Sequence, residues 1–119
     1  MSTRRQGGGS RGLADALRAA ERLVEALERR GVRVEAAYLF GSRVRGDWLV
    51  SSDVDLVIVS PGFRGLRYLE RLDLVERVQW EEGIAPHVEA VPLTPEELAE
   101  RLRGSAVLRD ASRYWVRVR

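Results

Sequence analysis

The sequence predicts one α/β domain, of the α+β type, in which a small mixed β-sheet is flanked by helices. Three observations lead to this prediction: a helical stripe of apolar residues over 12–30, two short apolar runs at 32–40 and 53–60, and a helix-start signal at 94–97. Strands that alternate with helical segments are typical of such domains. A chain of 119 residues has room for one modest core.

The first predicted helix covers residues 12–30. Its apolar residues recur at the i, i+3, i+4 and i+7 positions, which lie on one face of a helix. They are Leu13, Ala16, Leu17, Ala20, Leu23, Val24 and Leu27. Gly31 fits the C-terminal end of this helix. Residues 1–11 are basic and rich in glycine, with no apolar run to bury, so we expect a disordered basic tail before a domain of 12–119.

The later elements follow from turn and helix-capping signals. Pro61-Gly62 closes the second predicted strand. A second helix is predicted over 66–80, with Leu66, Leu69, Leu72, Val75 and Gln79-Trp80 on one face. Residues 87–91 form a short third strand.

A capping box with proline at the first helical position begins the next helix at Thr94, and Gly104 ends it. The last fifteen residues read as a short helix to Ser112 and then a strand through Tyr114, Val116 and Val118. The predicted order is therefore α-β-β-α-β-α, followed by this C-terminal segment.

Composition excludes several classes of function. The net charge of +2 gives no strong field to attract nucleic acid. Because the chain has no cysteine, disulfides, zinc-thiolate sites and a cysteine nucleophile are excluded. No apolar run approaches the ~20 residues that span a bilayer, and no secretory signal is visible. We therefore expect a cytoplasmic protein with no membrane association.

Residues 41–55 contain the main functional signal. A Gly41-Ser42 turn directly follows the first predicted strand, and Asp53 and Asp55 open the second. Backbone N–H groups of such a turn can bind phosphate. Alternate residues of a strand share a face, so the two carboxylates lie about 7 Å apart along the strand and can bind Mg²⁺. This is the minimum equipment for chemistry on a nucleoside triphosphate.

Each part of this segment also has an ordinary structural interpretation. Glycine after a strand is usually a loop residue, and Ser42 could cap a helical turn. Arg45 could form an ion pair with Asp47 rather than bind phosphate. Trp48 could stack on a base, but an aromatic residue in a loop more often covers core or contacts a partner. The combination in fixed order favours the phosphate chemistry: a strand, a Gly-Ser turn with arginine, and Asp-x-Asp at the start of the next strand.

The paired motif Gly41-Ser42-x-x-Arg45-Gly46 and Ser52-Asp53-x-Asp55-Leu56 resembles the signature of the minimal nucleotidyltransferases of the DNA polymerase β superfamily. The resemblance runs from the first helix to the Thr94 helix and implies the nucleotidyltransferase fold. Members bind two Mg²⁺ ions through carboxylates and transfer a nucleoside monophosphate from an NTP to a hydroxyl. For this chain the resemblance implies nucleotide binding by Gly41, Ser42, Arg43 and Arg45.

The resemblance also implies a third carboxylate on a neighbouring strand, and Glu89 stands at the matching position. Asp53, Asp55 and Glu89 would then be the catalytic residues and the metal ligands. Aspartate is more usual than glutamate at the third position. The alternative for Glu89 is an ordinary solvent-facing strand residue. His87 lies two positions away and is more simply a capping or surface residue.

The resemblance implies an enzyme that moves a nucleoside monophosphate, expected to be AMP from ATP, to an acceptor hydroxyl. Small members of the family often act as antitoxins that adenylylate a helical partner toxin of the HEPN type. A HEPN-type protein or a second copy of the chain could complete the acceptor side. The main alternative is an inactive binding module that neutralises a partner by contact, since Glu89 replaces aspartate. Transfer to a small molecule such as an aminoglycoside is disfavoured, because no larger C-terminal domain is present.

Overall fold

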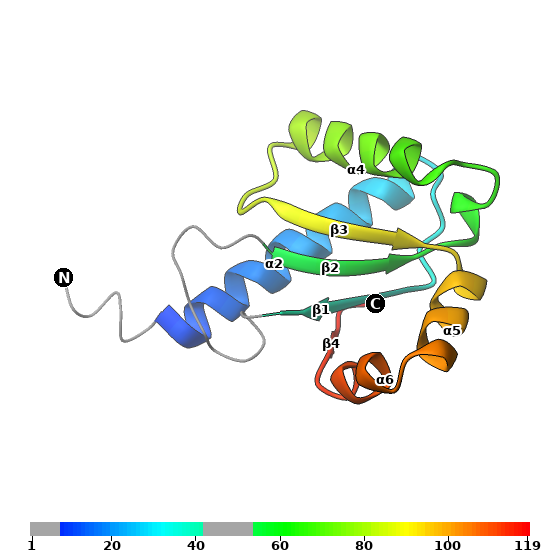
Figure 1. Cartoon of the computed structure of the whole chain (residues 1–119). Coiled ribbons are helices and arrows are strands. Elements are labelled where there is room, and N and C mark those ends of the chain that lie inside the picture. The colour runs from blue at the N-terminus through cyan, green and yellow to red at the C-terminus, as the bar shows by residue number, and fades with distance from the viewer. Residues whose placement is uncertain (1–7, 42–53) are drawn as a thin grey trace.

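The computed structural model describes residues 8–41 and 54–119 and confirms the predicted order of elements (Figure 1). The helices are α2 (Gly8–Arg29), α4 (Tyr68–Glu82), α5 (Pro95–Gly104) and α6 (Ala106–Ser112), with a 3-10 turn at Pro61–Phe63. The strands are β1 (Ala36–Phe40), β2 (Val54–Val59), β3 (Val88–Leu93) and β4 (Val116–Arg117). They form a sheet of order β3-β2-β1-β4 in which only β2 and β3 are parallel. The sheet is mixed, as predicted.

Element boundaries differ from the prediction at several ends. Helix α2 begins at Gly8 rather than at residue 12, because the helix continues beyond its apolar stripe. It therefore includes part of the range 1–11 that we expected to be a tail; residues 1–7 lie outside the described residues. Strand β1 begins at Ala36 rather than at residue 32. After Gly31, with φ +90°, the N–H of Val32 still bonds to the carbonyl of Leu27 and completes the helix end.

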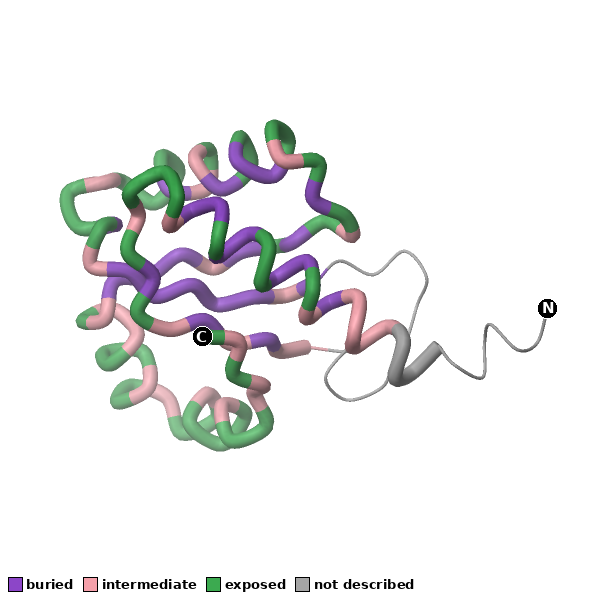
Figure 2. The backbone as a smooth tube through the Cα atoms, turned by 180° about the vertical axis from the view of Figure 1, so that it is seen from behind, coloured by how far each residue is buried: buried purple, intermediate pink, exposed green. Residues whose placement is uncertain are grey.

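Helices α2 and α4 cover one face of the sheet, where the main core lies. Figure 2 shows this face from behind, with the buried side of α2 against the strands. The predicted stripe of α2 is buried or half-buried throughout. The alternate residues Val54, Leu56 and Ile58 of β2 are fully buried in this core, as the strand periodicity requires. Asp55 therefore belongs to the opposite face.

The opposite face has a smaller apolar cluster that covers only part of it. Val57, Val59 and Leu93 are buried there, and Leu98 of α5 packs against them. The ring of Trp115 lies 5.6 Å from that of Tyr38 and 6.0 Å from that of Phe40 between centroids, and adds aromatic cover over β1. Glu89 on β3 is exposed. Among residues 8–41 and 54–119, this cluster does not extend over Asp55 and Glu89 at the start of β2 and β3.

Helix α4 runs along the outer edge of β3 and binds it through polar side chains. The amide of Gln79 accepts from the N–H of Val88 at 2.8 Å and donates to its carbonyl at 2.9 Å. About two turns earlier on α4, Nη1 of Arg71 donates to the carbonyl of Pro92 at 3.1 Å. Pro92 has no N–H that would need a partner. Side chains of α4 thereby replace a neighbouring strand along part of this edge.

This arrangement corrects part of the buried face that we predicted for α4. The prediction placed Leu69 and Trp80 on that face, but they are 73% and 84% exposed. The buried residues are Arg71, Val75, Val78 and Gln79. Val75 and Gln79 are buried as predicted, whereas hydropathy missed Arg71, a charged residue that is buried here as a partner of the edge strand. Within residues 8–41 and 54–119, no helix combines the length and apolarity needed to cross a bilayer.

Candidate active site

Gly41 and Asp55 meet where β1 ends and β2 begins. Phe40 and Asp55 are paired across the antiparallel strands, and Gly41 follows at φ +90°. A Cβ atom on Gly41 would lie 2.3 Å from Oδ2 of Asp55. Glycine is therefore required at this position for two reasons: the left-handed backbone and the close approach of the carboxylate. The glycine of the Gly-Ser turn is in direct contact with one predicted metal ligand.

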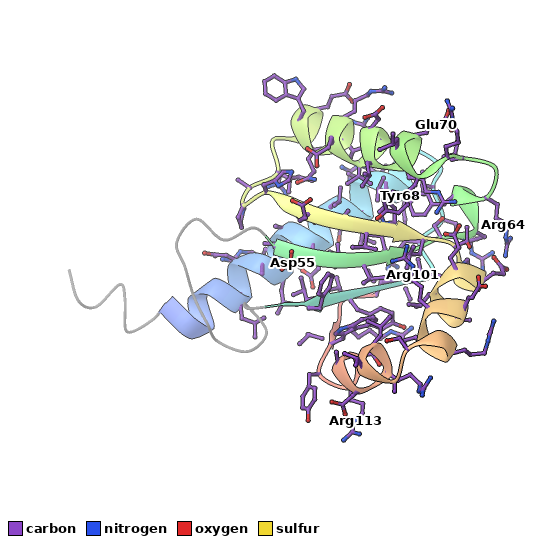
Figure 3. All side chains as sticks on the ribbon, in the orientation of Figure 1. Asp55, Arg64, Tyr68, Glu70, Arg101 and Arg113 are labelled. Carbon is purple, nitrogen blue, oxygen red and sulfur yellow. The ribbon has the colours of Figure 1, made fainter. Side chains whose placement is uncertain are left out.

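Asp55 and Glu89 are neighbours across the parallel strands β2 and β3. They are register partners, so their backbones lie about 4.8 Å apart and their side chains leave the same face of the sheet. Asp55 is half-buried and Glu89 is exposed on the face opposite α2 and α4. Figure 3 shows Asp55 at the end of the sheet where β2 begins. The structure therefore brings together two of the three predicted carboxylates beside Gly41.

The other predicted site residues lie outside the described residues. They are Ser42, Arg43, Arg45 and Asp53. The described residues that flank them are Gly41 and Val54, and the N–H of Val54 donates to the carbonyl of His87 at 2.9 Å. In the described part of the chain no three acidic or histidine side chains form a metal-binding group. Asp53, which would be the third member, lies outside that part.

His87 is an exposed surface residue that contacts helix α4. Its Nε2 lies 2.9 Å from a carboxylate oxygen of Glu76. This contact ties the start of β3 to the helix that covers its edge. Such an exposed contact contributes little to stability. The contact is in keeping with the structural interpretation of His87 that the sequence favoured.

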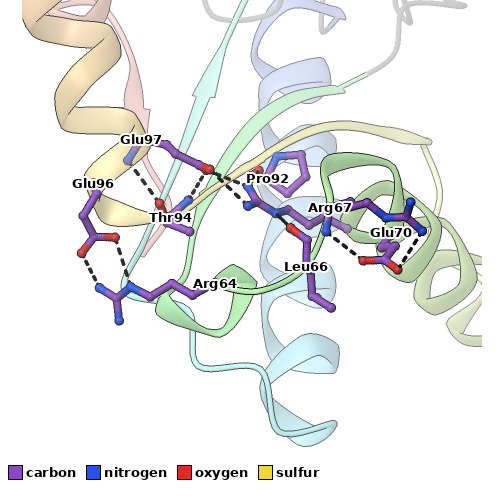
Figure 4. Close-up of polar contacts among 9 residues, drawn as sticks. Arg64, Leu66, Arg67, Glu70, Pro92, Thr94, Glu96 and Glu97 are labelled. Atoms are coloured by element: carbon purple, nitrogen blue, oxygen red, sulfur yellow. Dashed lines mark hydrogen bonds and ion pairs between the residues drawn. The ribbon is translucent and has the colours of Figure 1, made fainter.

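A partly buried ion pair anchors the opposite end of the site face. The guanidinium of Arg71 bonds to both carboxylate oxygens of Glu97, at 2.6 and 3.1 Å, and Nε donates to the carbonyl of Leu66 (Figure 4). The same carboxylate accepts from the N–H of Thr94 at 2.9 Å and closes the predicted capping box. We call this set the Arg71–Glu97 clamp. It joins α4, the end of β3 and α5.

Through Glu97, the clamp makes the free energy of unfolding depend on pH in acid. Its hydrogen bonds from Arg71 hold the pKa of Glu97 at about 2, below the ordinary 4.5. A depressed carboxyl pKa stabilises the fold fully above the ordinary value, and this stabilisation is lost as the pH falls from about 4.5 towards 2. Solvent screens part of the effect, because the Glu97 side chain is 40% exposed.

We expect Glu97→Gln to lower the free energy of unfolding at pH 7 and to flatten its decline between pH 4.5 and pH 3. Urea denaturation at several pH values measures both. The control is Glu100→Gln, an exposed change on the same helix. Equal pH profiles for wild type and Glu97→Gln would contradict the assignment.

Two residues near this end were missed by the sequence prediction. Tyr68 opens α4, and Arg101 lies in the last turn of α5. Figure 3 shows both over the far ends of β2 and β3, away from Asp55 along the strands. Burial raises the pKa of the Tyr68 phenol above 10, with the charges of Glu97 and Glu89 adding to this and those of Arg101 and Arg71 opposing it. No sequence signal could reveal these effects on the pKa of Tyr68, because they depend on how α4 and α5 pack against β3.

Comparisons with known proteins agree with this geometry. The nucleotidyltransferase domain family matches residues 20–111. The structure is similar to a crystal structure of a Sulfolobus solfataricus protein provisionally classed as a nucleotidyltransferase. The two are 28% identical, with a TM-score of 0.61, over 77% of this chain and 78% of the other. No curated protein matches the chain significantly. The match over most of its length shows that the chain belongs to the nucleotidyltransferase domain family, whose reaction is nucleotidyl transfer.

Proposed function

We propose that this chain is a Mg²⁺-dependent enzyme that transfers AMP from ATP to the hydroxyl of an acceptor. The observation that supports the proposal most strongly is the pairing of Asp55 and Glu89 on adjacent strands, with Gly41 against Asp55. A glycine beside two carboxylates on one face of the sheet suits a triphosphate and its cation.

The carboxylates fit the metal that this reaction needs. Oxygen ligands from acidic side chains are those that Mg²⁺ prefers, and two adjacent carboxylates repel each other without a cation between them. We propose that Asp55 and Glu89 hold Mg²⁺ together with Asp53, which would share their face if the alternation of β2 continues by two residues. When bound, two Mg²⁺ ions would neutralise the charge of the triphosphate and of the departing pyrophosphate.

The remaining proposed roles follow from charge and hydrogen bonding. Gly41 and Ser42 would offer N–H and O–H donors to the phosphates, and Arg43 and Arg45 would pair with phosphate oxygens. Glu89 would accept the proton of the acceptor hydroxyl as its oxygen attacks the α-phosphorus. The bond between the α-phosphorus and the bridging oxygen then breaks, and pyrophosphate leaves in line with the attack.

The acceptor we propose is a protein, a helical partner of the HEPN type. Family resemblance suggests it, and a second copy of the chain is the other candidate for completing the acceptor side. The competing function is a binding module of the same fold that neutralises its partner by contact alone. The two functions differ in whether a covalent bond forms, so one measurement separates them.

The test is to incubate the protein with a purified helical protein of the HEPN type and with ATP labelled at either the α- or the γ-phosphate. We expect label from α-labelled ATP on the partner, none from γ-labelled ATP, and loss of transfer when EDTA removes Mg²⁺. Restoration by added Mg²⁺ controls for damage by the chelator. A tight complex with no label from either ATP would support the binding module and contradict the enzyme.

A further inference from the structure

Glu89 lies at the start of β3, the strand at one edge of the sheet. On its inner side β3 pairs with β2, and the N–H of Val54 donates to the carbonyl of His87 at 2.9 Å. Among the described residues no strand lies on its outer side. The ends of an edge strand open easily, because only one neighbouring strand holds them. The position of Glu89 therefore depends on what binds the outer edge of β3.

The amide of Gln79 binds this outer edge at the residue next to Glu89. It accepts from the N–H of Val88 at 2.8 Å and donates to the carbonyl of the same residue at 2.9 Å. One side chain thus makes both hydrogen bonds that a neighbouring strand would make with Val88. Since the backbone groups of successive residues point to opposite edges of a strand, Gln79 holds β3 from outside while β2 holds it from inside.

The amide is itself held firmly in place. Gln79 is only 4% exposed, and its helix α4 runs along β3 (Figure 1). At the far end of β3, the Arg71–Glu97 clamp binds the carbonyl of Pro92. Helix α4 therefore fixes β3 at two points. Release of the first point would leave the buried polar groups of Val88 and the amide unpaired, which costs free energy.

The carboxylate of Glu89 depends on this backbone contact for its place in the site. Glu89 is the register partner of Asp55, so the two side chains leave the same face of the sheet. The side chain of Glu89 is exposed, and within residues 8–41 and 54–119 no hydrogen bond or ion pair holds it. Its direction is therefore set by the backbone of β3. Val88, which precedes it directly, is the residue that Gln79 binds.

We propose that Gln79 is a positioning residue for nucleotidyl transfer. By holding Val88, it keeps the carboxylates of Glu89 and Asp55 close enough to bind Mg²⁺ together. The proposal rests on the proposed function and adds to it a residue outside the carboxylate site. Residues that hold a metal ligand in place without touching the metal typically change metal affinity or activity by roughly 10- to 100-fold.

The alternative is that Gln79 only stabilises the fold. A purely structural residue changes the fraction of molecules that are folded, whereas a positioning residue changes turnover and metal affinity in folded molecules. All variants are therefore compared under conditions in which circular dichroism shows them to be folded. Gln79→Met is the main variant, because it keeps the size of the side chain and removes both hydrogen bonds to Val88. Gln79→Asn, whose amide is one methylene shorter, replaces it if Gln79→Met does not fold.

The first readout is the binding of Mn²⁺ alone, followed by electron paramagnetic resonance. We expect Gln79→Met to bind Mn²⁺ about tenfold more weakly than wild type. The second readout is the transfer of label from α-labelled ATP to the purified HEPN-type protein. Here kcat should fall about tenfold with little change in the KM for ATP, because the proposed triphosphate ligands on the Gly41 side do not depend on β3.

Two further variants test whether Gln79 acts through Glu89. In a Glu89→Gln background, Gln79→Met should change kcat and Mn²⁺ affinity by less than about twofold, because both changes then affect the same ligand. The matched control is Val24→Ala on α2, which weakens the same core by leaving a cavity at a fully buried position. It should lower the free energy of unfolding and leave kcat and Mn²⁺ affinity unchanged.

Several results would overturn the proposal. Wild-type Mn²⁺ affinity and kcat in folded Gln79→Met would show that the amide has a structural role only. Equal losses in Val24→Ala would show that any loss of stability has the same effect, and full additivity with Glu89→Gln would show that Gln79 acts through another group. Wild type that binds no Mn²⁺ contradicts the proposal as well. If wild type binds Mn²⁺ but transfers no label, the proposed function has failed instead, and the Mn²⁺ titrations decide the role of Gln79.

Discussion

We expect Asp55→Asn to reduce AMP transfer at least 100-fold while the protein stays folded. Asparagine has the size of aspartate and fits beside Gly41, but it has no charge with which to hold a cation. Loss of one group that stabilises charge in a transition state typically costs 10²–10³ in rate. The measurement is the initial rate of label transfer from α-labelled ATP, with far-UV circular dichroism to confirm the fold.

Two further variants sharpen this experiment. Asp73→Asn removes an exposed carboxylate on α4, away from the site, and should leave transfer unchanged. Glu89→Gln should reduce transfer strongly, whereas Glu89→Asp should retain much of it, because aspartate is the usual acid at the third position of the resembling family. Transfer by Asp55→Asn at more than a tenth of the wild-type rate would contradict the proposed metal site.

The second large effect is a loss of stability, which we expect from Gln79→Glu. The amide of Gln79 is the donor for the carbonyl of Val88 and the acceptor for its N–H, in a buried position. A carboxylate of the same shape can accept but cannot donate. The variant therefore leaves a buried carbonyl opposite a negative charge, and we expect a loss of roughly 2–3 kcal/mol at pH 7.5. Urea denaturation measures it.

The same variant should recover stability in acid. A protonated carboxyl group has one donor and one acceptor, as the amide does. Burial and the missing donor raise its pKa in the folded state, so the variant is most stable, relative to wild type, below the ordinary carboxyl value. This recovered stability is lost again as the pH rises through the raised pKa of the new carboxyl group. Gln79→Met removes both bonds at every pH and serves as the control. A deficit for Gln79→Glu that is the same at pH 5 and pH 7.5 would contradict the role of this amide.

Several features of the fold could be predicted because they depend on local rules. The stripe of α2, the alternation in β2 and the capping box at Thr94 each need only their own neighbours, and the structure has all three. The burial of Arg71 on α4 could not be predicted, because burial of a guanidinium is favourable only where acceptors such as the carbonyl of Pro92 and the carboxylate of Glu97 face it.

The candidate site divides in the same way. The order of motifs along the chain indicated Gly41 and Asp55, and the resemblance to the nucleotidyltransferase family added Glu89. The sequence could not show that Asp55 and Glu89 are partners across parallel strands, because that depends on the register of two segments separated by α4.

By itself the sequence determined the family, the order of elements and the residue types available for phosphate and metal chemistry, since these are properties of contiguous segments. Only the tertiary structure decided that Arg71 belongs to the buried face of α4 and how closely Gly41 approaches Asp55. The reason is physical. Each of these depends on the packing of segments distant in sequence, where one buried hydrogen bond or one missing Cβ outweighs a local preference.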